Sequence, residues 1–137
     1  MRSLRSLLLA FIVLLSFGGR AFAAEDPLFI NLTSDLKDHS AEMALVFAKN
    51  AVARGHEVTV FLNDQAVIGA SVSYPGLDQV RALLELLIDK KATVIACRHC
   101  MAHYGVDETA LIKGIRSGDP DLVFGKLFAP GTRTLSW

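Results

Sequence analysis

Short apolar runs alternate along this chain with longer segments of helical periodicity. The runs at 28–32, 57–62 and 93–97 have the length and the Leu, Ile, Val and Phe content of buried strands. Between them, residues 41–54 and 78–91 carry apolar side chains every three to four positions, as helices that cover a core do. Such alternation in 137 residues predicts one α/β domain, with a mainly parallel, open sheet flanked by helices.

The segments outside this pattern are shorter. Residues 66–70 are expected to form a short helix or a lid over the end of the sheet. Asp107 is expected to cap a further short helix, whose apolar residues are Leu111, Ile112 and Ile115. A last helix is expected at 121–128 and a last strand at 132–137.

The first 23 residues have the three parts of a secretory signal peptide. Arg2 and Arg5 precede an apolar run at 7–17, and Ala21-Phe22-Ala23 offers a small-residue cleavage pattern. That run is shorter than the roughly 20 residues that span a bilayer, so an uncleaved anchor is the weaker alternative. We expect a signal peptide at 1–23, a mature domain at 24–137, and secretion across the inner membrane to the periplasm.

The mature chain does not have the charge of a nucleic-acid-binding protein. The whole chain has 14 basic and 14 acidic residues, and Arg2, Arg5 and Arg20 leave with the signal peptide. The mature domain then has 11 basic residues against 14 acidic ones, a net charge of −3. Since phosphate binding relies on clustered Lys and Arg, we expect no nucleic-acid partner. No amphipathic segment indicates membrane binding after cleavage.

Both cysteines lie where the third predicted strand runs into a helical turn. Cys97 ends the strand, Cys100 follows three residues later, and His103 three residues after that. In parallel sheets, reactive groups collect at the carboxyl ends of the strands. A thiol at the start of a helix faces unpaired backbone N–H groups and the positive end of the helix dipole, which favour the thiolate. We therefore expect Cys97 to be a nucleophile, the alternative being a small buried side chain.

The spacing of Cys97, Cys100 and His103 allows other chemistries. In an oxidising compartment the two cysteines can form a dithiol/disulfide pair, although no cis-proline loop of a thioredoxin fold is apparent. Two thiolates and an imidazole can also hold a soft ion such as copper(I) or zinc, but a fourth ligand is missing. Haem attachment is excluded because Met101 stands where Cys-x-x-Cys-His needs histidine. The sequence has no nucleotide-binding or hydrolase motif, so we expect no cofactor.

Polar residues at the ends of the first two predicted strands share a rim with Cys97. They either line a common pocket or serve only as turn and cap residues, and they are Ser34, Asp35, Asn63 and Asp64. His39 and His56 are assigned no catalytic role.

The order of these segments resembles the DsrE-like (DsrE/DsrF-like sulfur-relay) family. The similarity covers nearly all of residues 27–137, and its most diagnostic parts are 54–63 and 94–106, which includes Tyr104-Gly105-Val106. It implies an α/β fold with flavodoxin- or Rossmann-like layering and assembly as homotrimers or hexamers. In the family's sulfur-relay members, a cysteine after a central strand carries a persulfide between partner proteins. Cys97 matches that cysteine.

Two features differ from the cytoplasmic relay proteins of that family, namely the expected signal peptide and the pair of Cys100 with His103. We interpret the chain as an exported, sulfurtransferase-like carrier in which Cys97 accepts sulfur, Cys100 is the resolving partner and His103 is a proton or ligand group. Its expected partners are sulfur donor and acceptor proteins and further copies of itself. The alternatives are a copper- or zinc-binding module or a dithiol redox protein using the same three residues, and an oligomeric scaffold with inert cysteines.

Overall fold

The fold is described from a computed structural model, which describes residues 25–137. The expected signal peptide at 1–23 lies outside these residues. No helix within 25–137 is long and apolar enough to cross a membrane.

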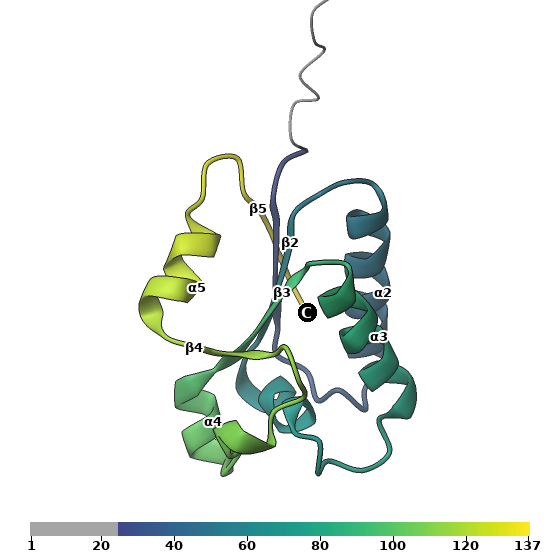
Figure 1. Ribbon diagram of the computed structural model, residues 1–137, viewed down its shortest axis with the longest axis vertical. Coiled ribbons are helices and arrows are strands. Elements are labelled where there is room, and N and C mark those ends of the chain that lie inside the picture. Colours follow the sequence, from purple (N-terminus) through teal and green to yellow (C-terminus); the bar gives the residue numbers. More distant parts are fainter. Residues whose placement is uncertain (1–24) are drawn as a thin grey trace, which may run out of the picture.

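Five strands form one sheet (Figure 1). Their bounds are β1 (Leu28–Leu32), β2 (Val58–Leu62), β3 (Thr93–Cys97), β4 (Arg116–Gly118) and β5 (Arg133–Ser136). They lie in the order β4-β3-β2-β1-β5, and every neighbouring pair is parallel. The predicted α/β class and parallel sheet are therefore confirmed.

The helices cover both faces of the sheet. Between the strands lie α2 (His39–Ala53), η1 (Asp64–Ala70), α3 (Asp78–Asp89), α4 (Arg98–Tyr104), η2 (Glu108–Ala110) and α5 (Pro120–Leu127). Right-handed crossovers that step from β1 to β2 to β3 place α2 and α3 on one face, whereas the return from β4 to β5 places α5 on the other. Figure 1 shows α2 and α3 on one side of the strands and α5 on the opposite side.

The core lies between the sheet and the pair α2 and α3. Alternate strand residues such as Ile30, Val60 and Val94 face this layer and are fully or almost fully buried. They meet the apolar stripe of α3, from which Leu84 and Leu87 are inaccessible to solvent. This stripe is the one that the spacing predicted.

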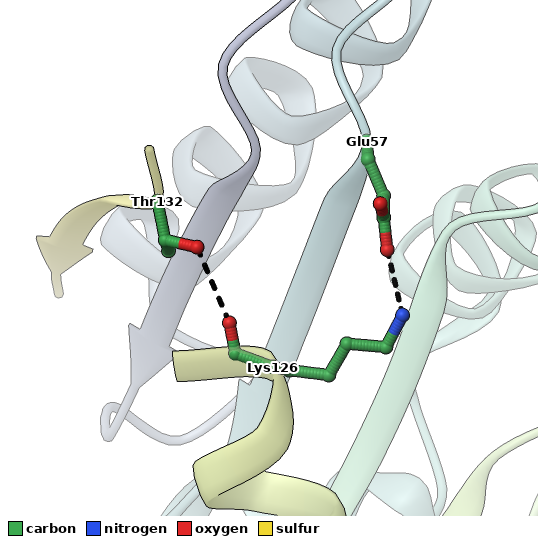
Figure 2. Close-up of polar contacts among 3 residues, drawn as sticks. All are labelled: Glu57, Lys126 and Thr132. Atoms are coloured by element: carbon green, nitrogen blue, oxygen red, sulfur yellow. Dashed lines mark hydrogen bonds and ion pairs between the residues drawn. The ribbon is translucent and has the colours of Figure 1, made fainter. Parts of the chain in front are cut away.

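Helix α5 covers the opposite face and is fixed at its end by polar contacts. Lys126 Nζ lies 2.6 Å from Glu57 Oε1, just before β2, and Thr132 Oγ1 donates to the Lys126 carbonyl at 3.4 Å (Figure 2). None of the residues of α5 is buried, and Phe124 and Phe128 are 56% and 76% exposed. The helix is therefore a thin cover for this face.

The prediction of a helix after Asp107 is wrong beyond the first turn. Asp107 does cap a turn, with its Oδ1 accepting from Thr109 N–H at 2.8 Å, but η2 ends at Ala110. Leu111 instead bridges Ser71 in an antiparallel contact, and Gly114 has a φ of +97°, which a helix does not allow. The chain then extends into β4, whose three residues pair with the end of β3.

Candidate functional site

Cys97 is placed by both the sheet and the helix that follows it. It is the last residue of β3 and the N-cap of α4, and its Sγ accepts from the backbone N–H of Cys100 at 3.3 Å. On the side of β4 its register partner is Gly118. A Cβ on Gly118 would lie 2.5 Å from Ile95 Cγ2, so only glycine lets β4 pack this closely beside the thiol. The predicted strand-end position of Cys97 is confirmed.

Cys100 lies one helical turn away with its sulfur next to that of Cys97. The two Sγ atoms are 2.7 Å apart, and both cysteines are free and half-buried. The Cys100 thiol also lies 3.1 Å from Oδ1 of Asn63, an acceptor without a proton to give. Cys100 has a single thiol proton, which is shared between Asn63 Oδ1 and Cys97 Sγ, while its backbone N–H also donates to Cys97 Sγ.

The loop after β2 supplies the other wall of the site. Asn63 Nδ2 donates to Asn31 Oδ1 at 3.2 Å, which fixes the amide so that its oxygen points to Cys100. The next residue, Asp64, has a φ of +47°, in the left-handed region that a residue with a Cβ rarely adopts. The Asp64 N–H donates to Cys100 Sγ, at 3.3 Å, and to Asn63 Oδ1, at 2.9 Å.

Tyr104 joins the loop to α4. Its hydroxyl donates to Asp64 Oδ1 at 2.5 Å. Tyr104 follows Cys100 by four residues on the same helix, so the two side chains point to the same side. The hydrogen bond to the Asp64 carboxylate, which stabilises the neutral phenol, raises the pKa of Tyr104.

The protonated form of Cys100 is favoured by its surroundings. Partial burial is the main cause that raises the pKa of the Cys100 thiol, followed by its hydrogen bond to Cys97. The Asp64 N–H has the opposite effect, because it stabilises the thiolate, but the net direction is upward. These surroundings hold Cys100 in its thiol form.

The structure does not bring every residue of the cysteine segment to the two sulfurs. His103 is exposed, and its ring stacks edge-on against Tyr104, with centroids 4.8 Å apart. Arg98 is exposed and donates from Nε to Ser117 Oγ at 3.3 Å, and His99 is exposed as well. Among residues 25–137 no group of three or more His, Cys, Asp or Glu side chains is placed to hold a metal ion.

The polar residues of the rim separate into two groups. Asn63 and Asp64 contact the thiols, whereas Asp35 binds the Tyr74 hydroxyl at 2.9 Å and the Lys37 N–H. Tyr104 and Asn31 were not predicted as site residues. The four-residue spacing from Cys100 is the sequence signal that points to Tyr104.

The two remaining histidines lie away from the thiols. His39 is highly exposed and lies 3.5 Å from Glu42 at the start of α2. His56 Nδ1 is 2.9 Å from the Asp26 carbonyl, before the start of β1 and β2. Neither residue contacts Cys97 or Cys100 in the described part of the chain.

Taken together, the contacts describe a dithiol site at the carboxyl edge of the sheet. A sulfur that accepts two hydrogen bonds is suited to carry negative charge, and a partner sulfur 2.7 Å away is within reach of attack on any sulfur bound to it. This arrangement is compatible with both thiol exchange and sulfur transfer.

Comparison with known proteins identifies the family. The profile of the DsrE/DsrF-like family matches residues 27–123. A search of curated proteins gave no match.

Solved structures with the same fold come from bacteria and an archaeon. The ychN protein from E. coli matches with a TM-score of 0.71 and 19% identity, over 82% of this chain and 100% of that one. Protein MTH1491 from Methanobacterium thermoautotrophicum, of unknown function, matches with a TM-score of 0.68 and 12% identity, over 82% and 100% of the two chains. Protein BT1422 from Bacteroides thetaiotaomicron, also of unknown function, gives a TM-score of 0.65 and 25% identity, over 86% and 100%.

The family match, which spans most of the domain and includes both cysteines, agrees with the parallel sheet that places Cys97 at a strand end. The chain belongs to the DsrE/DsrF-like family.

Proposed function

We propose that this protein is a sulfur carrier, which accepts a sulfane sulfur on Cys97 and passes it to a thiol acceptor. Family membership supports sulfur-relay chemistry in general. The observation that carries the assignment to Cys97 is the pair of hydrogen bonds from Cys100, N–H at 3.3 Å and S–H at 2.7 Å, that converge on Cys97 Sγ. Both stabilise a thiolate there, which is the nucleophilic form of cysteine.

The transfer step conserves atoms and charge. The Cys97 thiolate attacks the terminal sulfur of a donor persulfide, R–S–SH. A bond forms between Cys97 Sγ and that sulfur, the donor S–S bond breaks, and the electron pair leaves on the donor thiolate. The proton stays on the transferred sulfur, which gives Cys97–S–SH. A thiolate of the acceptor then attacks the same terminal sulfur and releases Cys97 as a thiolate.

Cys100 provides a second exit for the bound sulfur. Once Cys100 ionises, its thiolate attacks Cys97 Sγ. The bond between Cys97 Sγ and the terminal sulfur breaks, hydrosulfide leaves, and a Cys97–Cys100 disulfide forms. Because the pKa of Cys100 is raised, the thiol form prevails at neutral pH and this exit is slow. Cys100 thus acts as a resolving residue whose reactivity is held down.

His103, export and assembly complete the proposal. His103 is one turn beyond Cys100 on the exposed side of α4, where it can exchange protons with an approaching donor or acceptor. We place the protein in the periplasm because of its N-terminal signal pattern. We propose homotrimers or hexamers by family resemblance, with donor and acceptor proteins as transient partners.

The test is the intact mass of the protein after incubation with a persulfide or polysulfide donor and removal of the excess. The proposal predicts one added sulfur atom on the reduced wild type and on Cys100→Ser, and none on Cys97→Ser. The Cys100→Ser variant is the matched control, because it removes a thiol from the same site. Retention of the added sulfur in Cys97→Ser would overturn the assignment.

A dithiol redox protein is the second candidate, favoured by the 2.7 Å between the two sulfur atoms. In that case an external disulfide is reduced to two thiols while Cys97 and Cys100 form a disulfide. This redox function predicts that the protein loses the mass of two hydrogens when it is treated with a small disulfide oxidant. The rate of this loss should fall strongly in both single serine variants. Sulfur transfer to Cys97 instead persists in Cys100→Ser, and this difference separates the two functions.

A further inference from the structure

A groove lies at the opposite end of the sheet from the cysteines. It has a volume of about 590 Å³ and lies between the C-terminal half of α2 and the starts of β1 and β5. Small-molecule sites occupy roughly 300–1,000 Å³, so the groove is large enough for a ligand of more than a few atoms. Leu28 and Arg133 begin their strands, whereas Cys97 ends its strand, so the groove is separate from the dithiol site.

The topology of the sheet explains why this space is open. Helix α2 joins β1 to β2, and α3 joins β2 to β3, so both helices lie over the middle of the sheet. The edge strand β5 is reached by α5 from the other face (Figure 1). On the α2 side, therefore, no helix of the described chain crosses over β5. The groove is the step between α2 and this uncovered edge.

The lining combines an apolar floor with a cationic rim. The floor consists of Leu28 and Leu135 from the two neighbouring strands and of Phe47 and Ala51 from α2. The rim carries the three basic side chains Arg54, His56 and Arg133, together with one acid, Asp26.

The rim retains positive charge after its internal contacts are made. Asp26 Oδ2 pairs with Arg133 Nε at 3.0 Å, which leaves the two terminal nitrogens of that guanidinium. Arg54 NH1 donates to the Asn50 carbonyl at 2.9 Å, and Arg54 makes no ion pair among residues 25–137. Two guanidinium groups against one carboxylate, above an apolar floor, complement a molecule with one negative group and an apolar body.

We propose that this groove binds a small amphipathic anion, whose apolar part lies on Leu28, Phe47 and Leu135 and whose carboxylate, sulfonate or phosphate contacts Arg54 and Arg133. The ligand enters from the open side of β5. This site acts independently of Cys97 and does not rest on sulfur transfer.

The chain contains its own reporter for the site. Trp137 is the single tryptophan, and its ring lies 5.7 Å from that of Phe47, which lines the groove. An aromatic ligand in the groove is thus close enough to Trp137 to receive its excitation energy.

A matched pair of fluorescent ligands tests the proposal. The full-length mature protein is titrated with 8-anilinonaphthalene-1-sulfonate and, separately, with N-phenyl-1-naphthylamine, which has the same aromatic body without the sulfonate. The sulfonate is expected to bind at one site per chain, to quench Trp137, and to be displaced by decanoate. Equal affinity of the charged and uncharged ligands would overturn the role of the arginines.

Surface variants locate the site. The double variant Arg54→Gln with Arg133→Gln is expected to weaken binding of the sulfonate about tenfold and to leave the affinity for the uncharged ligand unchanged. Arg98→Gln with Arg116→Gln, two exposed arginines near the cysteine end, is the control with the same loss of charge. Phe124→Ser with Phe128→Ser tests for binding to the exposed face of α5 instead.

Three results contradict the proposal. One is unchanged binding in the Arg54 and Arg133 variant, and another is loss of binding in the α5 variant alone. The third is an absence of binding together with a change of oligomeric state in the Arg54 and Arg133 variant, which would show that a second copy of the chain fills the groove.

Discussion

The side-chain oxygen of Asn63 shares the thiol proton of Cys100 with Cys97 Sγ, at 3.1 Å from the Cys100 sulfur, across the gap between the end of β2 and the first turn of α4. The two residues are 37 positions apart in the sequence and lie in different elements. The contact exists because β2 and β3 run parallel in register, Leu62 beside Ala96, so that Asn63 follows directly beside Cys97 and its helix. It makes the reactivity of Cys100 depend on a loop that carries no chemistry itself.

Replacing Asn63 with aspartate is therefore expected to raise the pKa of Cys100 further, because a carboxylate within hydrogen-bond distance disfavours the thiolate. The measurement is the pH dependence of alkylation of Cys100 in a Cys97→Ser background. Asn50→Asp, the same change on α2 near the groove, is expected to leave the titration unchanged. A similar shift in both variants would argue against the contact.

The lifetime of a persulfide on Cys97 is expected to fall as pH rises. Cys100 must lose its proton before it attacks, and below its raised pKa the thiolate fraction grows about tenfold per pH unit. Hydrosulfide release from the sulfur-loaded protein, measured from about pH 6 to 9 across the range in which cysteines begin to ionise, follows this fraction. In Cys100→Ser the release should be slow and nearly independent of pH. An identical profile in both proteins would remove Cys100 from the mechanism.

Tyr104 is expected to titrate above the usual range because the Asp64 carboxylate holds its proton. In Asp64→Asn that negative charge is gone, so the pKa of Tyr104 should move down toward its ordinary value. Ultraviolet titration can follow this change in a Tyr74→Phe background, where Tyr104 is the only tyrosine. If Asp64→Asn leaves the midpoint where it was, the hydrogen bond does not set it.

Two glycines give opposite expectations for stability. In Gly118→Ala the new methyl group would lie 2.5 Å from Ile95 Cγ2 and 3.1 Å from the Ala96 carbonyl, so the free energy of unfolding should fall by about 1–3 kcal/mol. Gly125, inside α5, has nothing within 4 Å of an added Cβ. Gly125→Ala should therefore raise the free energy of unfolding by up to about 1 kcal/mol. Urea denaturation measures both, and equal effects would contradict the close packing beside Cys97.

The sequence was sufficient to predict the strands that are buried on both faces. β1 and β3 are nearly continuous apolar runs, and the α3 stripe has the period of a helix. It was not sufficient for β4, which has three residues, two of them polar, and is defined only by pairing with β3. Local pattern cannot show a strand whose existence depends on a partner about 20 residues away.

The same limit applies to the site. Cys97 and Cys100 could be found from their spacing, because a thiol at a strand end followed one turn later by another is a local arrangement. The sequence also grouped His103 with the two cysteines. Six residues along a helix turn a side chain by about 240° from its starting direction, so His103 points away from Cys97. Asn63 contacts Cys100 through sheet register, which no local spacing reveals.

The position of β5 beside β1 also bears on the order of folding. Leu28 pairs with Arg133, and Thr33 donates from both its N–H and its Oγ1 to the Trp137 carbonyl, at 2.8 and 2.6 Å. The first strand of the domain thus has an open edge until residues 133–137 are available to close it. Contacts so distant in sequence form slowly, and an open edge strand invites pairing with other chains. During synthesis or transport, the domain is expected to remain vulnerable to aggregation until its last strand has docked.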